Sequence, residues 1–386
     1  MPNLSRRDAL SAVVAVPAAA CLAGRSRAVA QAVPPAFPGM IVRMRQPLNL
    51  EFPFSELKAL ETPQEQFYVR NHFAVPKLDA NAFRLSIEGH VEQPLKLSLA
   101  DLAALGESTL GNTLECAGNG RIFLIPQVRG LQWGHGAVGN ARWTGTPLAA
   151  VLERAKVKPG AMEVILVGED VGAVAGDNPS PGPIPFDRSI PMEKAMKPET
   201  ILAHSMNGEK LTPNHGAPLR AIVGGWYGMA SIKWLRRIIV TDRPYQGFWQ
   251  TMDYADYERS NGLPSLTPIT AMLPKAVIAR PTLGDVLPVD REITIFGAAW
   301  AGENAVDFVE FSSDEGKSWS NVKFTGRSKP FEWRFWTTTW TPTVRGPAKL
   351  LVKATDTKGR TQSMERDPDR RTYRINHLVP VDVLVK

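Results

Sequence analysis

Residues 114–121 read Leu114-Glu115-Cys116-Ala117-Gly118-Asn119-Gly120-Arg121, and the interpretation of the whole chain starts from this segment. Its glycines allow the backbone to approach a ligand closely. Arg121 lies five residues after Cys116, and a nearby cation favours the thiolate, which is the form that attacks carbon or binds a soft metal. The segment therefore indicates a functional thiol, with an inert buried cysteine as the alternative.

Two other segments, 67–72 and 214–234, are also dense in polar and glycine residues. If the three segments meet, their cations form a pocket suited to phosphate or small oxyanions. His72 and His215 could instead serve Cys116 as the base of a cysteine-dependent hydrolase. The cations concerned are Arg70, Arg121, Arg220 and Lys233.

The composition narrows the class of protein. The chain has 386 residues, 44% of them hydrophobic and 22% charged, which predicts a globular protein of two or three domains. Its 2 cysteines are too few for a disulfide scaffold, a Cys₄ zinc site or an iron–sulfur cluster. No Cys-x-x-Cys-His segment occurs, so covalent haem attachment is excluded.

Residues 1–32 have the features of an export signal. The pair Arg6 and Arg7 precedes a mild apolar stretch over residues 9–24, which is too short to span a bilayer stably, and small-x-small cleavage sites follow. This pattern predicts a twin-arginine signal peptide and hence a protein of the periplasm. Cys116 is then the only cysteine of an exported chain, where a lone thiol needs a reason.

The charge that remains after the signal is modest. The formal net charge is +7, but residues 1–32 hold four Arg and one Asp, so the rest of the chain carries +4. No run of Lys and Arg follows the signal, so we expect no nucleic-acid partner.

Two regions of different texture follow the signal. Residues 33–65 are Pro-rich and read as irregular, and the region up to residue 272 then alternates strand-like runs with helices. Its expected elements are strands at Phe83–Gly89, Met162–Gly168 and Arg237–Thr241, helices at Leu99–Leu105 (begun by Ser98) and Pro147–Lys156, and a long loop over Asp170–Pro191.

Residues 273–386 consist of short strand-like runs separated by turn signals, which predicts an immunoglobulin-like sandwich. Nothing in this region resembles a catalytic motif, so we expect it to support or to associate. The expected strands are Lys275–Ile278, Glu292–Trp300, Ala305–Ser312, Trp333–Trp340 and Ala348–Asp356, with turns at Asp314-Glu315-Gly316 and Thr357-Lys358-Gly359.

Four motifs occur in one order along the chain: Phe-Tyr-Val-Arg-Asn-His at 67–72, Glu-Cys-Ala-Gly-Asn-Gly-Arg at 115–121, His-Gly-x-Pro-x-Arg at 215–220 and Ser-Ile-Lys-Trp-Leu at 231–235. In this order and spacing they resemble the sulfite oxidase family of mononuclear molybdenum enzymes. The resemblance implies an α+β fold class, with a sulfite-oxidase-type molybdopterin-binding domain over residues 33–272. It also implies an immunoglobulin-like dimerisation domain over 273–386, and hence a homodimer.

The resemblance also implies roles for individual residues. Cys116 would supply the single protein thiolate to molybdenum, which a pyranopterin dithiolene also holds. Arg70 and Arg121 would face the substrate oxyanion, and Tyr254 would be the active-site tyrosine, with Tyr257 as its rival. The residues that would line the cofactor are Tyr68, Val69, Arg70, Asn71, His72, Asp170, His215, Arg220, Ser231, Ile232 and Lys233.

The activity implied by the resemblance is the oxidation of sulfite to sulfate. Animal members carry a fused haem domain and plant nitrate reductases carry haem and flavin domains, but this sequence resembles neither. Electrons would therefore leave to an external acceptor, which we expect to be a c-type cytochrome, with oxygen as the alternative. The alternatives are a molybdenum sulfoxide reductase or sulfur-compound dehydrogenase of the same fold, a cysteine-dependent hydrolase, and a non-catalytic exported binding protein.

Overall fold

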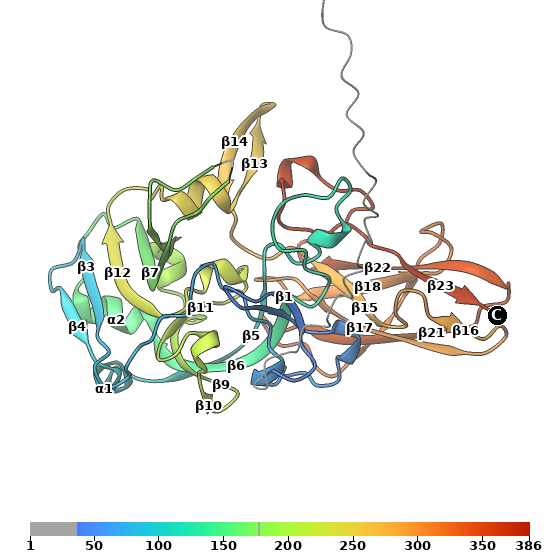
Figure 1. The fold of residues 1–386 in the computed structure, drawn as a ribbon, viewed down its shortest axis with the longest axis horizontal. Helices are drawn as coiled ribbons and strands as arrows, with labels where there is room; N and C mark the ends of the chain where they lie inside the picture. Colours follow the sequence, from blue (N-terminus) through green and yellow to red (C-terminus); the bar gives the residue numbers. More distant parts are fainter. Residues whose placement is uncertain (1–36, 177) are drawn as a thin grey trace, which may run out of the picture. The chain divides into compact units, whose positions relative to one another are not determined.

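Strands make up most of the regular structure in the computed structural model, which describes residues 37–176 and 178–386 (Figure 1). The predicted signal peptide lies outside the described residues. Within them the α-helices are α1 (Leu99–Ala104), α2 (Leu148–Ala155) and α3 (Met192–Ala195). None of the helices in this part of the chain has the length and apolar character needed to cross a membrane.

Two sheets form the first region of the described chain. One has the strand order β4-β3-β12-β7-β8, and the other has the order β10-β9-β6-β5 with β11 paired to β9. The strands of the first are β3 (Leu85–Gly89), β4 (Leu95–Leu97), β7 (Glu163–Gly172), β8 (Ile184–Pro191) and β12 (Leu235–Thr241). The strands of the second are β5 (Ser108–Glu115), β6 (Val138–Pro147), β9 (Thr200–Met206), β10 (Glu209–Lys210) and β11 (Arg220–Val223).

Both predicted helices of this region form, for the expected reasons. Ser98 caps α1 with a complete capping box, because its hydroxyl accepts from the amide of Asp101 while the Asp101 carboxylate accepts from the amide of Ser98. Helix α2 buries Leu148, Val151, Leu152 and Ala155 on one side.

Two predictions of irregular structure are wrong in part. Strand β7 continues to Gly172 and strand β8 begins at Ile184, so only the middle of the predicted loop Asp170–Pro191 lacks strand structure. Strand β8 tolerates its prolines because it lies at the edge of the sheet, where one side of the backbone needs no partner. The Pro-rich segment 33–65 contains a short antiparallel pair, β1 (Ile41–Met44) and β2 (Asn49–Glu51).

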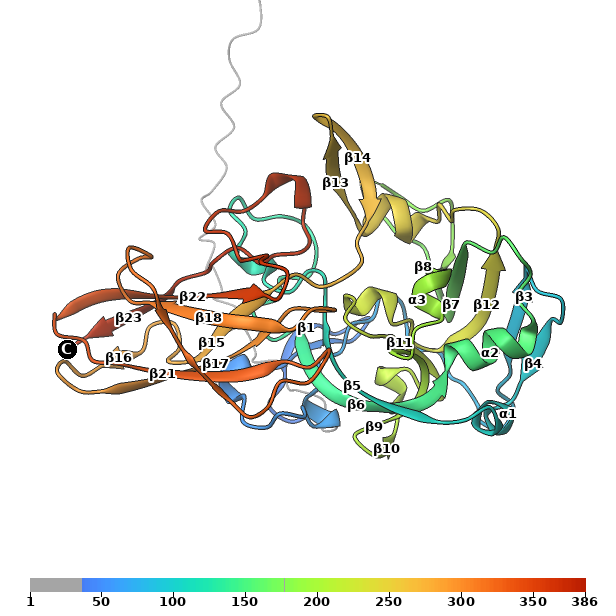
Figure 2. The same ribbon diagram turned by 180° about the vertical axis from the view of Figure 1, so that it is seen from behind.

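The C-terminal region consists of two sheets with a common core (Figure 2). All five predicted strands are present with boundaries shifted by one or two residues, and four short strands, β16, β19, β20 and β23, were not predicted. One sheet has the order β15-β17-β21-β20: β15 (Lys275–Arg280), β17 (Ile293–Trp300), β21 (Arg334–Trp340) and β20 (Lys323–Thr325). The other has the order β16-β23-β22-β18-β19: β16 (Val286–Leu287), β23 (Val381–Val385), β22 (Gly346–Asp356), β18 (Val306–Ser312) and β19 (Ser320–Asn321).

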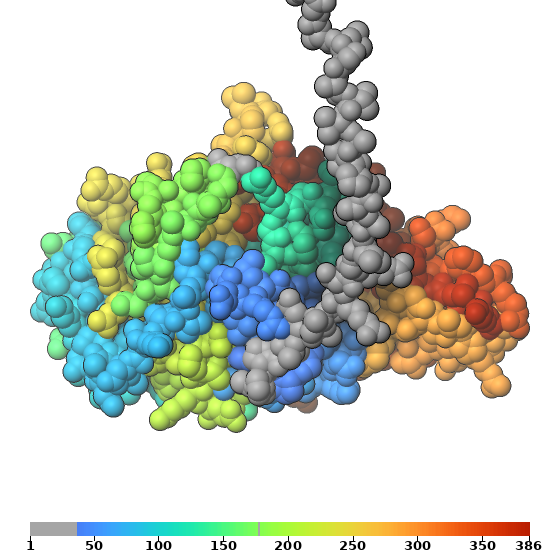
Figure 3. All heavy atoms as spheres, viewed as in Figure 1, coloured from blue at the N-terminus to red at the C-terminus, as the bar shows by residue number. Residues whose placement is uncertain are grey.

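A hairpin joins the two regions. Its strands are β13 (Ala255–Ser260) and β14 (Leu263–Pro268), and its tip stands out from the surface in Figure 3. Asn261 and Gly262 form the turn with φ of 51° and 80°, a conformation that this pair adopts readily. The main hydrophobic core continues across the junction, since Trp300 and Trp333 of the C-terminal region belong to it.

Short helical turns carry several of the predicted site residues or lie beside them. A π-helical turn, Trp249–Asp253, directly precedes Tyr254. The 3₁₀ turns are Phe54–Glu56, Gln64–Gln66, Arg121–Phe123, Pro213–His215, Gly228–Ala230 and Pro368–Arg370.

Candidate active site

Cys116 lies in a tight turn directly after strand β5. Its amide donates to the carbonyl of Ala137 at 2.9 Å, and its carbonyl accepts from the amide of Asn119 at 2.8 Å. Gly120 ends the turn at φ = 95°, a left-handed conformation that glycine adopts without strain. The backbone therefore holds a buried thiol in one place.

Cys116 lines two hollows, and the more enclosed of them, called here the enclosed cavity, has about 670 Å³ of empty space, solvent included. All four sequence motifs contribute to its wall, although they are far apart in the chain. Among the predicted residues, those that line it are Tyr68, Arg70, His72, Cys116, Asp170, His215, Arg220, Ser231, Lys233 and Tyr254.

The other hollow that Cys116 lines is an open cleft with about 1590 Å³ of empty space, solvent included. Arg121, Arg129 and Arg371 line this cleft, so its charge is predominantly positive. The cleft and the enclosed cavity share four lining residues, which are Arg70, His72, Cys116 and Tyr254. The thiol thus lies where a buried chamber meets a solvent-accessible one.

Three cations line the enclosed cavity, and oxygen atoms of the chain orient each of them. Arg220 donates to two main-chain carbonyls at 3.0 Å each. Lys233 donates to the carbonyl of Asn214 at 3.0 Å and to the side-chain oxygen of Asn71. Arg70 donates to the carbonyl of Asn71. This arrangement leaves a buried wall of positive charge.

The pKa values of these cations shift in different directions. Burial lowers the pKa of Arg70, but the nearby Tyr254 and the thiol of the site outweigh this effect and raise it. Burial lowers the pKa of Lys233 well below its usual value, and the nearby Arg220 lowers it further. Burial also lowers the pKa of Arg220, to about 10. Asp170 is the acid of this wall, and burial raises its pKa to about 6 against the opposing effect of Lys233. A bound anion would relieve the repulsion, so the cavity fits a phosphate-bearing ligand.

The thiol of Cys116 has an environment suited to a metal. Burial raises its pKa, while Arg70 and Arg121 oppose that rise. A soft cation beside the sulfur would supply the additional positive charge that the thiolate needs. A soft metal held with a phosphate-bearing organic ligand therefore fits both the thiol and the cations.

Both histidines of the cavity have partners other than the thiol. His215 shares a hydrogen bond with the Thr212 hydroxyl at 2.8 Å, and burial is the main cause that lowers its pKa to about 3. His72 lies 2.6 Å from the Tyr254 hydroxyl, and burial lowers its pKa well below the usual value. Among the described residues, no hydrogen bond joins either ring to Cys116, and a lowered pKa makes each imidazole a weaker base, so the geometry does not favour a cysteine-dependent hydrolase.

Tyr254 follows the π-helical turn, and the buried side chain of Arg188 holds that turn through hydrogen bonds to its carbonyls. The guanidinium of Arg188 donates to the carbonyls of Trp249 at 2.8 Å and Tyr254 at 3.3 Å, and also to that of Ile269 at 2.7 Å. Burial raises the pKa of the Tyr254 hydroxyl, so it remains protonated. Its rival Tyr257 is 41% exposed on the hairpin and lines neither chamber.

Arg121 faces the open cleft over the ring of Tyr373. Its guanidinium carbon lies 5.1 Å from that ring centroid, and it donates to the carbonyl of Leu131 at 3.0 Å. The Tyr373 hydroxyl donates to the Asp253 carboxylate at 2.7 Å, and its ring centroid lies 4.8 Å from that of Tyr254. Tyr373 therefore links the arginine to the tyrosine.

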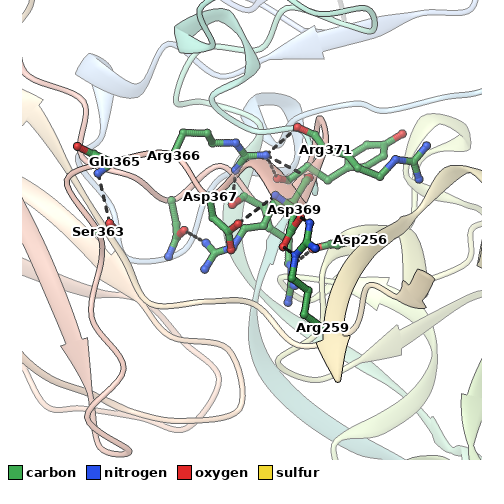
Figure 4. A network of polar contacts seen from close by, with 12 residues as sticks. Asp256, Arg259, Ser363, Glu365, Arg366, Asp367, Asp369 and Arg371 are labelled. Carbon is green, nitrogen blue, oxygen red and sulfur yellow. Dashed lines mark hydrogen bonds and ion pairs between the residues drawn. The ribbon is translucent and has the colours of Figure 1, made fainter. Parts of the chain in front are cut away.

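A polar network ties the segment that holds Tyr373 to the hairpin after Tyr254 (Figure 4). Arg259 forms two hydrogen bonds with Asp369, at 2.6 and 2.8 Å. Arg371 donates to the carbonyl of Ala255 at 3.0 Å, and Arg374 pairs with Asp256. The C-terminal region thus supports one wall of the cleft.

Comparisons with known proteins agree with this geometry. Residues 72–249 match the oxidoreductase molybdopterin binding domain, and residues 267–373 match the Mo-co oxidoreductase dimerisation domain. Sulfite oxidase from Gallus gallus is 33% identical over 346 residues, which cover 85% of this chain and 74% of the chicken protein. The chain belongs to the sulfite oxidase family.

Other members of the sulfite oxidase family differ from this chain in length. Mitochondrial sulfite oxidase from Drosophila melanogaster is 35% identical over 312 residues, which cover 76% of this chain but 53% of the fly protein. The chain thus spans about half of that relative. The sulfane dehydrogenase SoxCD from Paracoccus pantotrophus superposes with a TM-score of 0.73 at 28% identity, covering 86% of this chain and 83% of the other. The fold of this chain is therefore of the sulfite oxidase type.

Two of the residues carried over from the sulfite oxidase family do not line either chamber. The side chains of Val69 and Ile232 lie in the main hydrophobic core, so only their backbone is available to a cofactor. Asn71 and Arg121 line the open cleft but not the enclosed cavity. Val69 forms only an isolated bridge with Leu50, and Ile232 lies outside the strands, so the packing of the surrounding segments decides that these two side chains face the core.

Two cleft residues, Arg371 and Tyr373, were missed by sequence reasoning. They lie in the segment Arg370-Arg371-Thr372-Tyr373-Arg374, whose density of arginines was the only available signal. That segment lies in the region expected to support or to associate, where no site residue was assigned. Its proximity to Tyr254 depends on how the C-terminal sheets pack against the first region.

Proposed function

We propose that this protein oxidises sulfite to sulfate with a molybdenum–pyranopterin cofactor and passes the electrons to an external c-type cytochrome. The observation that carries the proposal is the position of Cys116, between an enclosed cavity lined by cations and an open cleft lined by arginines. The relatives whose names include sulfite oxidase support the choice of substrate.

The enclosed cavity is the proposed cofactor site. Cys116 would be the protein ligand of the metal, and Arg220 and Lys233 would bind phosphate. Among the described residues, no group of three His, Cys, Asp or Glu side chains could hold a metal ion, so the dithiolene would supply the other sulfur ligands. When bound, the cofactor supplies oxygen-atom transfer coupled to a two-electron redox change.

The open cleft is the proposed substrate site. Arg70 and Arg121 would bind the sulfite dianion and orient its sulfur toward the metal, because two guanidinium groups compensate two negative charges. Tyr254, which remains protonated, would donate a hydrogen bond to the oxyanion while His72 holds the phenol in place. The same three side chains would bind the negatively charged sulfate until it is released.

A second candidate is a dehydrogenase of another sulfur compound. The similarity to SoxCD, a sulfane dehydrogenase, favours this alternative. The cleft would then accept a larger substrate, and its open volume of about 1590 Å³ is compatible with one. The chemistry of Cys116 and the cofactor would be the same in both cases.

The test is an assay of the purified protein after its molybdenum content has been measured. We expect sulfite-dependent reduction of cytochrome c, and loss of both metal and activity in Cys116→Ser, because a hydroxyl is a poor ligand for a soft metal. Activity only with a sulfane-sulfur donor would establish the second candidate. Full metal loading without either activity would refute both. Hydrolysis of an ester or amide substrate by protein free of molybdenum would favour the hydrolase.

We further propose that the protein acts in the periplasm after export by the twin-arginine route. The predicted signal at residues 1–32 and the lone Cys116 of the remaining chain support this location. Fractionation of cells expressing wild type and an Arg6→Lys, Arg7→Lys variant would test it. The variant should remain in the cytoplasm, and export of both forms would contradict the proposal.

We also propose that residues 273–386 form an immunoglobulin-like domain that mediates a homodimer, distinct from the cofactor domain at residues 33–272. The match of residues 267–373 to a dimerisation domain supports this proposal. Sedimentation of the purified protein should give twice the chain mass, and a monomer at micromolar concentration would contradict it.

A further inference from the structure

Glu115 is the residue before Cys116, and both oxygens of its carboxylate accept hydrogen bonds. It has no role in binding the proposed cofactor or the substrate. It is 2% exposed and lines neither chamber. Its Oε1 atom accepts from Lys275 Nζ at 2.9 Å and Asn119 Nδ2 at 3.0 Å, and its Oε2 atom accepts from Trp300 Nε1 at 2.8 Å. A buried charge is thus placed one residue from the thiol and held by three donors.

Two of these donors come from the C-terminal region. Lys275 begins strand β15 and Trp300 ends strand β17, and the two residues are paired across the sheet. Both side chains of the ion pair are buried, with 5% of Lys275 and 2% of Glu115 exposed. The paired ends of strands β15 and β17 therefore supply the Lys275 ammonium and the Trp300 indole N–H to Glu115, the last residue of β5.

Lys275 holds both ends of the turn that carries the thiol. Besides the Glu115 carboxylate before Cys116, its ammonium binds the carbonyl of Asn119 after it, at 3.1 Å. The side-chain oxygen of Asn119 in turn accepts from the amide of Ala137 at 3.0 Å. Because one ammonium joins both ends, the turn cannot open without separating a buried ion pair.

The charges also act on the sulfur. Glu115 directly precedes Cys116 in the chain, so an unpaired carboxylate there would repel a thiolate. The ammonium of Lys275 offsets the carboxylate at a distance of 2.9 Å, so a thiolate at Cys116 is exposed to a nearly neutral pair. Removing either partner would leave one uncompensated charge beside the metal ligand.

We propose that the Glu115–Lys275 pair is a positioning and charge-balancing device for Cys116, supplied by the C-terminal region. It rests on the proposed function in that Cys116 is taken as the molybdenum ligand. The C-terminal region, expected only to support or to associate, would then fix the position of Cys116 and set how strongly its sulfur donates electrons to the metal. Glu115 and Lys275 are positioning residues, since neither reaches the reacting atoms.

The sign of the charge left behind makes the proposal testable. Lys275→Met leaves a carboxylate, which stabilises the more oxidised metal and shifts the midpoint potential of molybdenum downward. Glu115→Gln leaves an ammonium and shifts the potential upward. The double variant Glu115→Gln/Lys275→Met is neutral again, and its potential should return toward that of the wild type. A role in packing alone predicts no such pairing of opposite signs.

A second buried lysine paired with carboxylates, Lys194, provides the control, although its partner Glu303 is 41% exposed. Lys194 binds Glu199 at 2.9 Å and Glu303 at 2.6 Å, and Glu303 also accepts from the indole of Trp226 at 2.9 Å. These residues line neither chamber and are not adjacent to Cys116 in sequence. Lys194→Met should lower the unfolding temperature without shifting the potential.

The experiment measures molybdenum content first and then the midpoint potential of the loaded protein by redox titration monitored by electron paramagnetic resonance. Opposite shifts that cancel in the double variant support the proposal. So does loss of metal in both single variants with recovery in the double. Shifts of one sign, no shift in loaded protein, or metal loss that persists in the double variant would overturn it. Wild-type protein that binds no molybdenum would refute the proposed function itself.

Discussion

The Nε2 atom of His72 lies 2.6 Å from the hydroxyl oxygen of Tyr254, although 182 residues separate them in the chain. His72 also stacks on Phe186 with ring centroids 4.3 Å apart. The histidine therefore fixes the phenol at the boundary of the two chambers. Tyr254 lines both chambers, whereas Tyr257 lines neither, which favours Tyr254 as the proposed active-site tyrosine.

Replacement of Tyr254 by phenylalanine should lower turnover while the protein keeps its metal. The change removes the hydroxyl but keeps the ring that packs against Tyr373 and Trp249. Loss of a positioned proton donor typically costs about 10²-fold or more in rate. Steady-state kinetics with sulfite should show this loss in kcat. Tyr257→Phe is the control, and an equal loss there would contradict the assignment.

Arg121→Ala should weaken oxyanion binding without removing the cofactor. A hydrogen bond between charged groups contributes about 1.5–3 kcal/mol, so KM for sulfite should rise roughly 10- to 100-fold. Molybdenum content should be unchanged, because Arg121 lines the cleft and not the enclosed cavity. Arg142→Ala is the control, because it removes a half-exposed arginine of strand β6 that lines neither chamber. Unchanged substrate affinity in Arg121→Ala would mean that the cleft assignment is wrong.

Lys233→Met should impair retention of the cofactor more than folding. Methionine keeps the length of the side chain but removes the charge proposed to bind phosphate, and it also relieves the burial cost that lowers the pKa of Lys233. Metal and pterin analysis after purification should show a loss of both, with a circular dichroism spectrum like that of wild type. Lys210→Met, at an exposed position of β10, is the control. Normal loading in Lys233→Met would refute the phosphate-binding role.

Arg188→Met should destabilise the protein and displace Tyr254. Three carbonyls lose a buried charged donor, and such a loss costs about 3 kcal/mol or more of the free energy of unfolding. Urea titration should reveal the loss as a lower midpoint. Arg237→Met removes a half-exposed arginine of β12 and should cost less than about 1 kcal/mol. Equal effects of the two changes would contradict the anchoring role.

Ionisation of Asp187 should lower the free energy of unfolding as the pH rises through about 6. Burial raises its pKa from 3.8 to about 6, although the Tyr245 hydroxyl, which donates to it at 2.9 Å, opposes the rise. The folded state therefore keeps a proton that the unfolded chain has already released, and the stabilisation present below about pH 4 is lost above about pH 6. The full effect is about 3 kcal/mol.

The measurement for Asp187 is the free energy of unfolding by urea at about pH 4 and about pH 7. Asp187→Asn keeps the acceptor for Tyr245 but cannot ionise, so its stability should fall less between the two pH values than that of wild type. Comparing the two proteins removes the contribution of Asp170, whose pKa is raised in the same direction. Identical pH profiles would refute the prediction.

Local signals predicted elements where the physical cause is local. Ser98 predicted the start of α1 because a cap acts within one turn, and the alternating runs of the C-terminal region predicted five strands. The edge strand β8 was missed because its prolines read as loop. Only its position at the end of the sheet makes them harmless.

Sequence alone determined the family motifs, the lone thiol of the chain after its predicted signal, and the arginine five residues after that thiol. These features depend on residue types and short spacings, which are visible in one dimension. The tertiary structure decided which residues meet: Tyr254 with His72, Tyr373 with Arg121, and Lys275 with Glu115. Each pair is joined by packing between segments distant in the chain, and no periodicity within either segment carries information about its partner.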